Sequence, residues 1–566
     1  MSFCVKFSVL AAAVLALAAC GGSGGLSGSA GVRVSPSGIQ VLAGSTQQMT
    51  ATASDGGTTF TWQVNGVTGG NATVGTISTS GLYTAPHLPP GGGTVTISAT
   101  EQGMSGASGS TTLNIGYSNV SLQGGYVFSL DGRNQGTPQF VIGEFNANGA
   151  GQISNGLQDS NNGTTVQTKS AFAGSYSINP DGSGSLSLGN LEFQLVMQVG
   201  GYAFMLSTTS GTTLTGSLSP QDPAAGSVST LSGPLVLNAS QQIAASQGIG
   251  VLAGLNAITT GTISGTEDVS GPNPLIRASI TGSYAFDGNN HGTMTIKDSS
   301  GTHAYSFYVV SASDLTVLSN NATAPINGSL SSQQPITYSN VSLNGPYVFL
   351  MDGNSPTQGY VQAGQFNPNG TGSLGTVTED INTPGDLQNG LITAGTYAFD
   401  PTVNGRGTLT INNQGTGAPS TYVFYMVSPQ QADVMTTNSN IVAGGSILMQ
   451  TQGSSFHNSS LDGAYSFVLG AQTGAANLSA AVGTLSLDGN GNLSGKMLQN
   501  LNGTVSPTLS LSGTYNLNGS TRGTATLISS GGGSSPFAIY PVNANLFFLI
   551  GTDSASPYFG IATSQN

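Results

Sequence analysis

Apolar and polar residues alternate along short segments of this chain, and clusters of Gly, Asn, Ser and Thr separate the segments. Phe60, Trp62 and Val64 form one such set, and Tyr126 and Phe128 begin another. A period of two residues is typical of strands with one buried face, whereas an amphipathic helix repeats every 3.6 residues or so. Outside residues 1–20 no segment shows the helical period. Because parallel strands need crossovers that are usually helical, the pattern predicts an all-β protein of antiparallel strands.

Three sequence words recur in four copies and divide most of the chain into modules. The first word is Leu-x-Gly followed by alternating apolar residues, the second is Gly-Ser/Thr-Tyr, and the third ends on a Gln five residues after a Gly. The Gly residues of the first two words are 49 or 50 residues apart in every copy. The words begin at Leu122, Leu231, Leu343 and Leu461, at Gly174, Gly282, Gly395 and Gly513, and end at Gln221, Gln333, Gln450 and Gln565. Spacings kept through four copies indicate tandem repeats.

The modules span residues 117–223, 224–336, 337–454 and 455–566, and each reads as about eight short strands. Residues 117–122 recur verbatim as 338–343, which indicates that a pair of modules was duplicated. Eight meandering strands predict a closed up-and-down barrel without exposed edges. A single β-propeller built from half-modules is the alternative, because a blade has about fifty residues or slightly fewer. Large residues that would point inward favour filled barrels: Tyr126, Phe128, Phe193 and Phe204.

Residues 32–116 precede the modules and also read as short strands. The stretch Thr61-Trp62-Gln63-Val64-Asn65-Gly66, followed by Gly81-Leu82-Tyr83-Thr84-Ala85-Pro86, resembles the bacterial Ig-like domains of surface proteins. The resemblance implies a β-sandwich that serves as a spacer or an adhesion module, and it carries no catalytic residues. Trp62 is the only Trp of the chain and lies in the middle of a predicted strand, so we expect it to anchor the core.

The first twenty residues have the features of a processing signal. An apolar stretch ends at Leu17-Ala18-Ala19-Cys20, and the Gly/Ser-rich residues 21–31 that follow predict a flexible tether. The segment resembles the lipobox of bacterial lipoproteins. The resemblance implies cleavage before Cys20, acylation of Cys20 and stable attachment to a membrane. Gly21, in the place of a retention Asp, implies an outer-membrane or cell-surface location. An ordinary cleaved secretory signal is the alternative.

The composition excludes several classes of protein. Only 5% of the residues are charged, the net charge is −13, and the nine basic residues are scattered. A nucleic-acid-binding surface would need a basic patch, so we expect no nucleic-acid partner. The two cysteines are Cys4, inside the predicted signal, and Cys20. No disulfide can therefore form within the processed chain, and stability must come from burial and backbone hydrogen bonds.

Few residues suggest metal or cofactor chemistry. The loop Asp488-Gly489-Asn490-Gly491-Asn492 places oxygens at alternate positions, but it lacks the later Gly and the distal Glu of a calcium loop. We interpret it as a hairpin turn. The histidines have no metal-ligand spacing and no Cys to assist them, so no metal or cofactor is expected. They are His87, His291, His303 and His457.

An acidic residue recurs at one position of the modules, six residues after Ile153 and Leu374. Asp159 and Asp380 occupy the same place, Glu267-Asp268 lies near it in the second module, and Gln499 stands there in the fourth. Such an acid could bind sugar hydroxyls. A catalytic acid would not readily become Gln, so we favour a cap that accepts hydrogen bonds from backbone N–H groups.

Two further positions recur in the modules. A basic residue precedes a Gly-Thr pair in modules two to four, and we interpret it as a solvated turn position; the residues are His291, Arg406 and Arg522, with Ser183 in the first module. The Tyr of the second word is present in every module, which predicts a core Tyr whose hydroxyl has a partner. These residues are Tyr176, Tyr284, Tyr397 and Tyr515.

No motif supports a reaction, so we expect a non-enzymatic, lipid-anchored surface protein that acts in adhesion or in envelope or matrix interaction. Its partner would be a glycan or a surface protein. The alternative is a receptor or carrier that binds a small ligand or glycan inside its barrels or at their loops. A glycan-degrading enzyme would need two convergent carboxylates, and no pair of carboxylates recurs in the modules. We also expect few contacts between modules, so that residues 337–566 fold alone.

Overall fold

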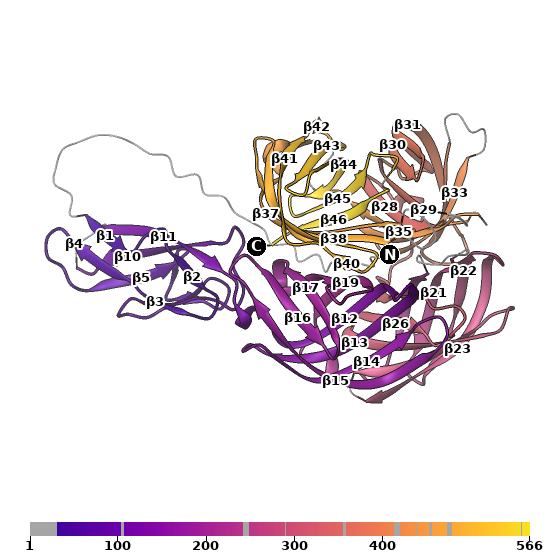
Figure 1. Cartoon of the computed structure of the whole chain (residues 1–566), viewed down its shortest axis with the longest axis horizontal. Coiled ribbons are helices and arrows are strands. Elements are labelled where there is room, and N and C mark those ends of the chain that lie inside the picture. Colours follow the sequence, from indigo (N-terminus) through magenta and orange to yellow (C-terminus); the bar gives the residue numbers. More distant parts are fainter. Residues whose placement is uncertain are drawn as a thin grey trace. The chain divides into compact units, whose positions relative to one another are not determined.

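The structure of the chain is a computed structural model, drawn in Figure 1. It describes residues 31–103, 107–241, 248–288, 290–354, 358–412, 419–437, 440–451, 455–472, 478–555 and 557–565. The predicted signal peptide, Cys20 and the tether up to residue 30 lie outside the described residues. Within the described part, residues 31–121 and 122–565 form two separate compact units.

The first unit is a small β domain whose sheets share one core. A five-stranded sheet has the order β2-β11-β10-β5-β6, a four-stranded sheet has the order β3-β9-β8-β7, and β1 pairs with β4. The pairing of β2 with β11 is parallel. Trp62 lies in the shared core with Tyr83, as expected for its anchor. The strands are β1 (Val32–Ser35), β2 (Gln40–Leu42), β3 (Thr46–Gln48), β4 (Thr50–Ala53), β5 (Phe60–Val64), β6 (Val67–Thr68), β7 (Gly70–Asn71), β8 (Gly75–Ile77), β9 (Leu82–Thr84), β10 (Thr94–Glu101) and β11 (Ser108–Gly116).

The second unit contains four antiparallel barrels, one within each predicted module. Barrel 1 consists of β12 (Gln123–Asn134), β13 (Thr137–Asn148), β14 (Gln152–Asn161), β15 (Val166–Ile178), β16 (Ser183–Leu188), β17 (Leu191–Met197), β18 (Ala203–Ser207) and β19 (Thr212–Pro220). Barrel 2 consists of β20 (Gly233–Ser240), β21 (Gly250–Ile258), β22 (Thr262–Ser270), β23 (Leu275–Gly288), β24 (His291–Lys297), β25 (Thr302–Ser311), β26 (Asp314–Ser319) and β27 (Asn327–Ser332).

The other two barrels repeat this order. Barrel 3 consists of β28 (Tyr347–Asn354), β29 (Gly359–Phe366), β30 (Ser373–Thr383), β31 (Asp386–Phe399), β32 (Arg406–Ile411), β33 (Ser420–Ser428), β34 (Gln431–Thr436) and β35 (Val442–Met449). Barrel 4 consists of β37 (Asp462–Gln472), β38 (Leu478–Asp488), β39 (Asn492–Leu501), β41 (Leu509–Asn516), β43 (Gly523–Ser529), β44 (Gly533–Asn543), β45 (Leu546–Gly551) and β46 (Phe559–Ser564). Accessory elements are β36 (Phe456–His457), β40 (Thr504–Val505), β42 (Asn518–Ser520), and the 3-10 helices η1 (Asn119–Ser121), η2 (Val199–Gly201), η3 (Ala225–Ser227), η4 (Asn340–Ser342) and η5 (Asn458–Ser460).

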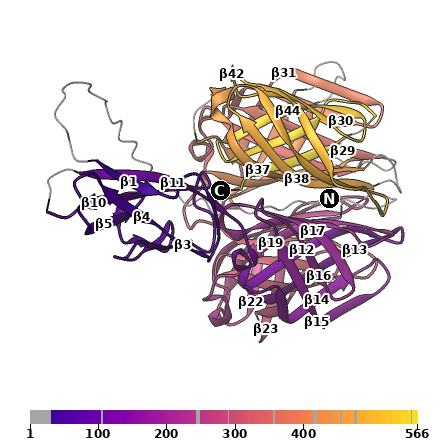
Figure 2. The same ribbon diagram turned by 60° about the vertical axis from the view of Figure 1, so that its left-hand side comes forward.

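Every barrel is an up-and-down meander that closes by pairing its first strand with its last. Barrels 1 to 3 close through β12–β19, β20–β27 and β28–β35. In barrel 4, β37 pairs with both β38 and β46, and β38 pairs with β39, so its eight main strands also form a complete circle. Figure 2 shows this barrel from the side of β37 and β38. The predicted tandem barrels are confirmed, and the propeller alternative is wrong.

The first word of each module supplies a cross-strand pair of one large and one small residue inside the barrel. Phe349 lies opposite Gly364, and a Cβ on that glycine would meet the Phe349 ring at 2.6 Å. Phe128 with Gly143 and Phe467 with Gly483 form the same pair. Barrel 2 instead has Leu237 opposite Ala253. Leu237 is smaller than the Phe of the other barrels, and Ala253 is larger than their Gly. The total volume of the pair therefore stays nearly constant.

The barrel interiors are occupied by large side chains, with one exception to the prediction. Tyr126, Phe128 and Phe193 are buried at positions whose counterparts in barrel 2 belong to its core. Phe204 is also buried, but it matches Thr316, which does not belong to that core, whereas the neighbouring Leu315 does. Phe204 therefore faces out of barrel 1. Every position of β18 is buried, so alternation alone could not separate its two faces.

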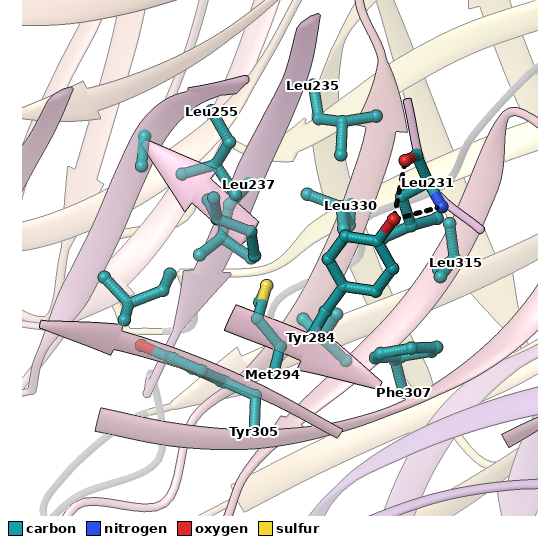
Figure 3. Close-up of a cluster of buried hydrophobic side chains, with 14 of the residues drawn as sticks. Leu231, Leu235, Leu237, Leu255, Tyr284, Met294, Tyr305, Phe307, Leu315 and Leu330 are labelled. Atoms are coloured by element: carbon teal, nitrogen blue, oxygen red, sulfur yellow. Dashed lines mark hydrogen bonds between the residues drawn. The ribbon is translucent and has the colours of Figure 1, made fainter. Parts of the chain in front are cut away.

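The recurring Tyr of the second word locks the start of each barrel, as Figure 3 shows for barrel 2. Tyr284 donates its hydroxyl hydrogen bond to the Leu231 carbonyl at 2.7 Å. The same bond joins Tyr176 to Leu122, Tyr397 to Leu343 and Tyr515 to Leu461, at 2.6, 2.9 and 2.8 Å. The acceptor is the Leu that opens the first word. The two words therefore recur together because they form one contact, and the prediction of a bonded core Tyr is confirmed.

Candidate functional site: the junctions between barrels

The four barrels contact one another in a closed cycle, which we call the barrel ring. Strands β12–β14 contact β25–β27, β20 and β21 contact β33–β35, and β28–β30 contact β44 and β45. Strands β37 and β38 contact β17–β19 of barrel 1. Each junction thus joins the first strands of one barrel to the last strands of the next. We name the junctions 1–2, 2–3, 3–4 and 4–1. The expectation of few contacts between modules is wrong.

The Gln that ends each module connects its barrel to the next one. Its backbone N–H donates to the first strand of its own barrel, for example from Gln221 to the Gly125 carbonyl at 2.8 Å. Its side chain donates to a backbone carbonyl of the following barrel: Gln221 to Val309, Gln333 to Met426 and Gln450 to Pro541, at 2.7, 2.6 and 2.6 Å. Gln565 donates to the carbonyls of Asp181 and Met197 in barrel 1, at 3.0 and 3.4 Å. The same residue therefore serves all four junctions and completes the ring.

Three junctions also contain a buried Asp from one barrel and a basic residue from the next. At junction 2–3, Arg406 donates two hydrogen bonds to Asp268, from Nη2 to Oδ1 at 2.7 Å and from Nε to Oδ2 at 2.8 Å. At junction 3–4, Arg522 binds Asp380 in the same forked way, at 2.7 and 2.8 Å. At junction 1–2, His291 Nε2 lies 3.2 Å from Asp159 Oδ2. Forked Arg–carboxylate pairs are both strong and geometrically specific.

A Tyr hydroxyl and a backbone N–H complete the environment of each Asp. The hydroxyls of Tyr308 and Tyr425 donate to Asp159 and Asp268 at 3.0 and 2.8 Å, and Tyr540 donates to Asp380. Within the same barrel, the N–H groups of Lys169, Arg277 and Gly390 donate to the three Asp residues at 2.8, 3.0 and 2.7 Å. These three donor residues have positive φ. The predicted backbone cap is therefore confirmed, but each Asp also binds the next barrel.

His291 and Arg406 are buried and Arg522 is largely covered, so the interpretation of these basic residues as solvated turn positions is wrong. The exposed fractions of the His291, Arg406 and Arg522 side chains are 1%, 7% and 19%. His291 and Arg406 begin β24 and β32, and Arg522 directly precedes β43. The neighbouring barrel covers these positions, and a sequence pattern within one module cannot show this. A comparison of successive modules could have found these residues, because a module with the acid is followed by a module with the base. The fourth module lacks the acid, and the first module, which follows it in the ring, has Ser183 in place of the base.

The electrostatics of these pairs follow from burial and partner charge. Burial alone would lower the pKa of His291, but its contacts with Asp159 and Asp287 outweigh burial and raise the pKa above 6.5. Burial would raise the pKa of Asp159, and the contact with His291 and the Lys169 N–H lower it below its usual value. Both shifts favour the charged pair. The pKa of Arg406 is raised in the same way by Asp268, against the effect of burial.

Junction 4–1 lacks the buried pair of Asp and base, although an exposed ion pair joins Lys496 Nζ to Asp181 Oδ2 at 3.4 Å. Val196 occupies the place of the Tyr, and Ser183 occupies the place of the base. Asp159 lies opposite Ile142, one residue before Gly143, and the residue in that register in barrel 4 is Leu498, opposite Val482. The assignment of Gln499 is thus wrong by one residue, because β14 contains a bulge and β39 pairs with β38 without one. An apolar residue here leaves no buried charge without a partner.

An Asn two residues beyond the Asp position adds a further contact at three junctions. Asn161 donates to the carbonyls of Ser319 and Asn321, at 2.8 and 2.9 Å. Asn382 donates to Gly551 and Asp553 in barrel 4, at 2.6 and 2.9 Å. Asn500 donates to Ser207 and Thr212 in barrel 1, at 2.8 and 2.7 Å. Junction 4–1 therefore keeps the Gln and Asn contacts although it lacks the buried ion pair.

Two buried carboxyl groups lie inside barrels rather than between them. Glu267 and Glu379 point inward opposite Ala253 and Gly364. Burial, reinforced by the nearby Asp298, raises the pKa of Glu267 to about 8. Burial raises the pKa of Glu379 to about 7, and its Oε2 accepts a 2.7 Å hydrogen bond from Gln362. The adjacent residues Glu267 and Asp268 therefore act on opposite faces of one strand.

The remaining candidate residues form local turns. Asp488 Oδ1 accepts hydrogen bonds from the N–H groups of Asn490 and Asn492 at 2.8 and 2.9 Å, as expected for a hairpin turn. Within the described ranges, no group of three or more His, Cys, Asp or Glu residues is placed to hold a metal ion. No helix in this part of the chain is long and apolar enough to cross a membrane. Comparisons with protein-family models, with curated proteins and with solved structures gave no match.

Proposed function

We propose that this protein is a non-enzymatic, lipid-anchored cell-surface protein that uses the outer face of its barrel ring for adhesion or for envelope or matrix interaction. The observation that carries the proposal is the distribution of burial. The first and last strands of the barrels are buried on both faces, as in β28 and β46, whereas β15 and β23 keep one face exposed. Large side chains occupy the barrel interiors. The exposed faces of the fourth and fifth strands are then the surface left for a partner.

That outer face carries isolated apolar side chains among polar ones. Ile276 on β23 and Ile392 on β31 have exposed fractions of 56% and 64%. The proposed partner is a glycan or a surface protein, and the lipid anchor at Cys20 and the Ig-like spacer would hold the ring away from the membrane.

The carrier alternative has one observation in its favour. Glu267 Oε1 and Glu379 Oε1 are buried oxygens without a hydrogen-bond partner. Both face barrel interiors, where a polar ligand or water could reach them. A screen of the full chain against glycans and matrix proteins, repeated with two sets of variants, separates the proposals. The adhesion proposal expects Ile276→Ser with Ile392→Ser to weaken the binding found, and Glu379→Gln to leave it unchanged. The reverse result would support the carrier.

Membrane attachment has its own test. Cys20→Ser removes the thiol that acylation needs, so the variant should leave the membrane fraction or accumulate unprocessed. Cys4→Ser is the matched control and should fractionate like the wild type. If Cys20→Ser also fractionates like the wild type, the anchor at Cys20 is wrong.

A further inference from the structure

Barrel 3 contains a polar network inside an otherwise apolar core. The hydroxyls of Tyr360 on β29 and Tyr422 on β33 donate to Gln362 Oε1 at 2.9 and 3.0 Å. Gln362 Nε2 donates in turn to Glu379 Oε2 on β30 at 2.7 Å. The exposed fractions of Gln362 and Glu379 are 0% and 1%. The two Tyr hydroxyls therefore orient the amide, and the amide holds the carboxyl group in the barrel interior.

The hydrogen bonds of this network suit a protonated Glu379. Because Oε2 accepts the N–H of Gln362, the proton of a neutral carboxyl group lies on Oε1. Oε1 is buried and has no hydrogen-bond partner. An ionised carboxylate would leave a negative oxygen in the interior without a donor, which costs more than a neutral hydroxyl without an acceptor. The network therefore favours the neutral form.

No basic side chain is available to pair with an ionised Glu379 inside barrel 3. The only Lys, Arg or His among residues 337–454 is Arg406, which binds Asp268 at junction 2–3. The neighbouring Asp380 points out of the barrel and binds Arg522 at junction 3–4. The ionisable members of the described core around Glu379 are all tyrosines: Tyr338, Tyr347, Tyr360, Tyr397 and Tyr422.

The other barrels show that this position does not need an acid. The residue that lies opposite the small Gly or Ala partner of the first word differs from barrel to barrel. It is Gln158 in barrel 1, Glu267 in barrel 2, Glu379 in barrel 3 and Met497 in barrel 4. A neutral residue therefore supports the same fold, and the ionisable group adds a dependence on pH.

We infer that Glu379 is a pH-sensitive lock inside barrel 3, which holds β29 and β30 together when it is protonated and loosens them when it ionises. Loss of the Oε1 proton to solvent leaves a charge that only water can solvate, so the two strands must part to admit water. Burial, opposed by the Gln362 hydrogen bond and reinforced by the charge of Asp380, raises the pKa of Glu379 from 4.5 to about 7. The lock is therefore complete below the unfolded pKa and is lost as the pH rises through the folded one.

The test measures hydrogen exchange of the β29 and β30 amides by mass spectrometry in the full chain. The wild type is compared with Glu379→Gln, which copies Gln158, at the same pH. Their ratio of exchange rates should grow at least about tenfold between a pH near 5 and a pH about one unit above the folded pKa of Glu379. Glu192→Gln changes an exposed Glu and is the matched control. It should keep the pH dependence of the wild type.

A second variant covers the case in which Glu379→Gln does not fold. Glu379→Met copies Met497 and should show the same loss of pH dependence. The protonated carboxyl group also gives an infrared C=O band, which should weaken in either variant at a pH about one unit below the folded pKa. The proposal is overturned if the ratio of exchange rates is the same at both pH values, if neither variant weakens the band, or if Glu192→Gln removes the pH dependence.

Discussion

In every module a hydrogen bond from a Tyr hydroxyl joins the second word to the Leu carbonyl that opens the first word. Tyr397 donates to the carbonyls of Leu343 and Asn340, each at 2.9 Å, and so holds η4 against the barrel. Tyr397→Phe keeps the aromatic ring but leaves the buried Leu343 carbonyl and the part-buried Asn340 carbonyl without this donor. We expect a loss of about 1–3 kcal/mol in the free energy of unfolding, measured by urea denaturation. A change below about 0.5 kcal/mol would show that the bond has no structural weight.

The glycine opposite the core Phe leads to a second prediction, on the stability of a variant with a larger residue at that position. Gly364→Ala places a Cβ 2.6 Å from the Phe349 ring and 2.8 Å from the Thr378 carbonyl, so the core must shift. We expect a loss of about 1–3 kcal/mol, as for other overpacked cores. Phe349→Leu should recover part of the loss in the double variant, because barrel 2 uses Leu237 with Ala253. Additive losses in a double-mutant cycle would contradict this pairing.

Between elements, the buried ion pairs decide how one barrel recognises the next. Arg522→Ser alone leaves Asp380 buried without its main partner, which should cost about 3–5 kcal/mol. Junction 4–1 supplies a natural replacement, with Leu498, Ser183 and Val196 at the three positions. The triple variant Asp380→Leu, Arg522→Ser and Tyr540→Val should therefore lose less stability than Arg522→Ser alone. If the triple variant is the less stable of the two in chemical denaturation, the junctions are not interchangeable.

Junction 1–2 differs from the other charged junctions because its base can lose its proton. The pKa of His291 in the folded state is raised above 6.5. Protonated His291 therefore stabilises the folded state fully at a pH below the unfolded pKa. This stabilisation is lost as the pH rises through the pKa of His291 in the folded state. Each unit of difference is worth about 1.4 kcal/mol. We therefore expect the wild type to lose stability as the pH rises above about 6.5, the unfolded pKa of a His side chain. His291→Arg, which copies Arg406, should flatten this profile, and an unchanged profile would remove His291 as its cause.

The whole second unit combines barrels that are closed one by one with junctions that make them a ring. Residues 337–566 are still expected to be soluble and to unfold cooperatively, since their barrels pair all of their own strands. The half nevertheless exposes the Arg406 side of junction 2–3 and the Leu498 side of junction 4–1. Mixed with residues 117–336, it should form a one-to-one complex, measured by light scattering. Asp268→Asn should weaken the complex at least about tenfold, and halves that ignore each other would contradict the ring.

The sequence predicted what is local to one module and missed what depends on the neighbour. The barrels, the hairpin turns and the bonded Tyr follow from alternation and spacing within about fifty residues. The partner of Asp268 is Arg406, 138 residues away in another module. Strands such as β18 are buried on both faces, so alternation does not tell inside from outside, and Phe204 was assigned to the wrong face. A one-residue bulge in β14 also shifted the register, which placed Gln499 where Leu498 stands.

The contact of Gln565 with Asp181 spans 384 residues and gives the chain an order of assembly. During synthesis from the N-terminus, each finished barrel can dock on the one before it, so junctions 1–2, 2–3 and 3–4 form in turn. Junction 4–1 must wait for the last barrel, and closing so long a loop is slow. Until then the Val196 and Phe204 side of barrel 1 lacks its cover. Closure of junction 4–1 is therefore the late step of folding, and an arrested chain would leave this surface exposed to aggregation or to a chaperone.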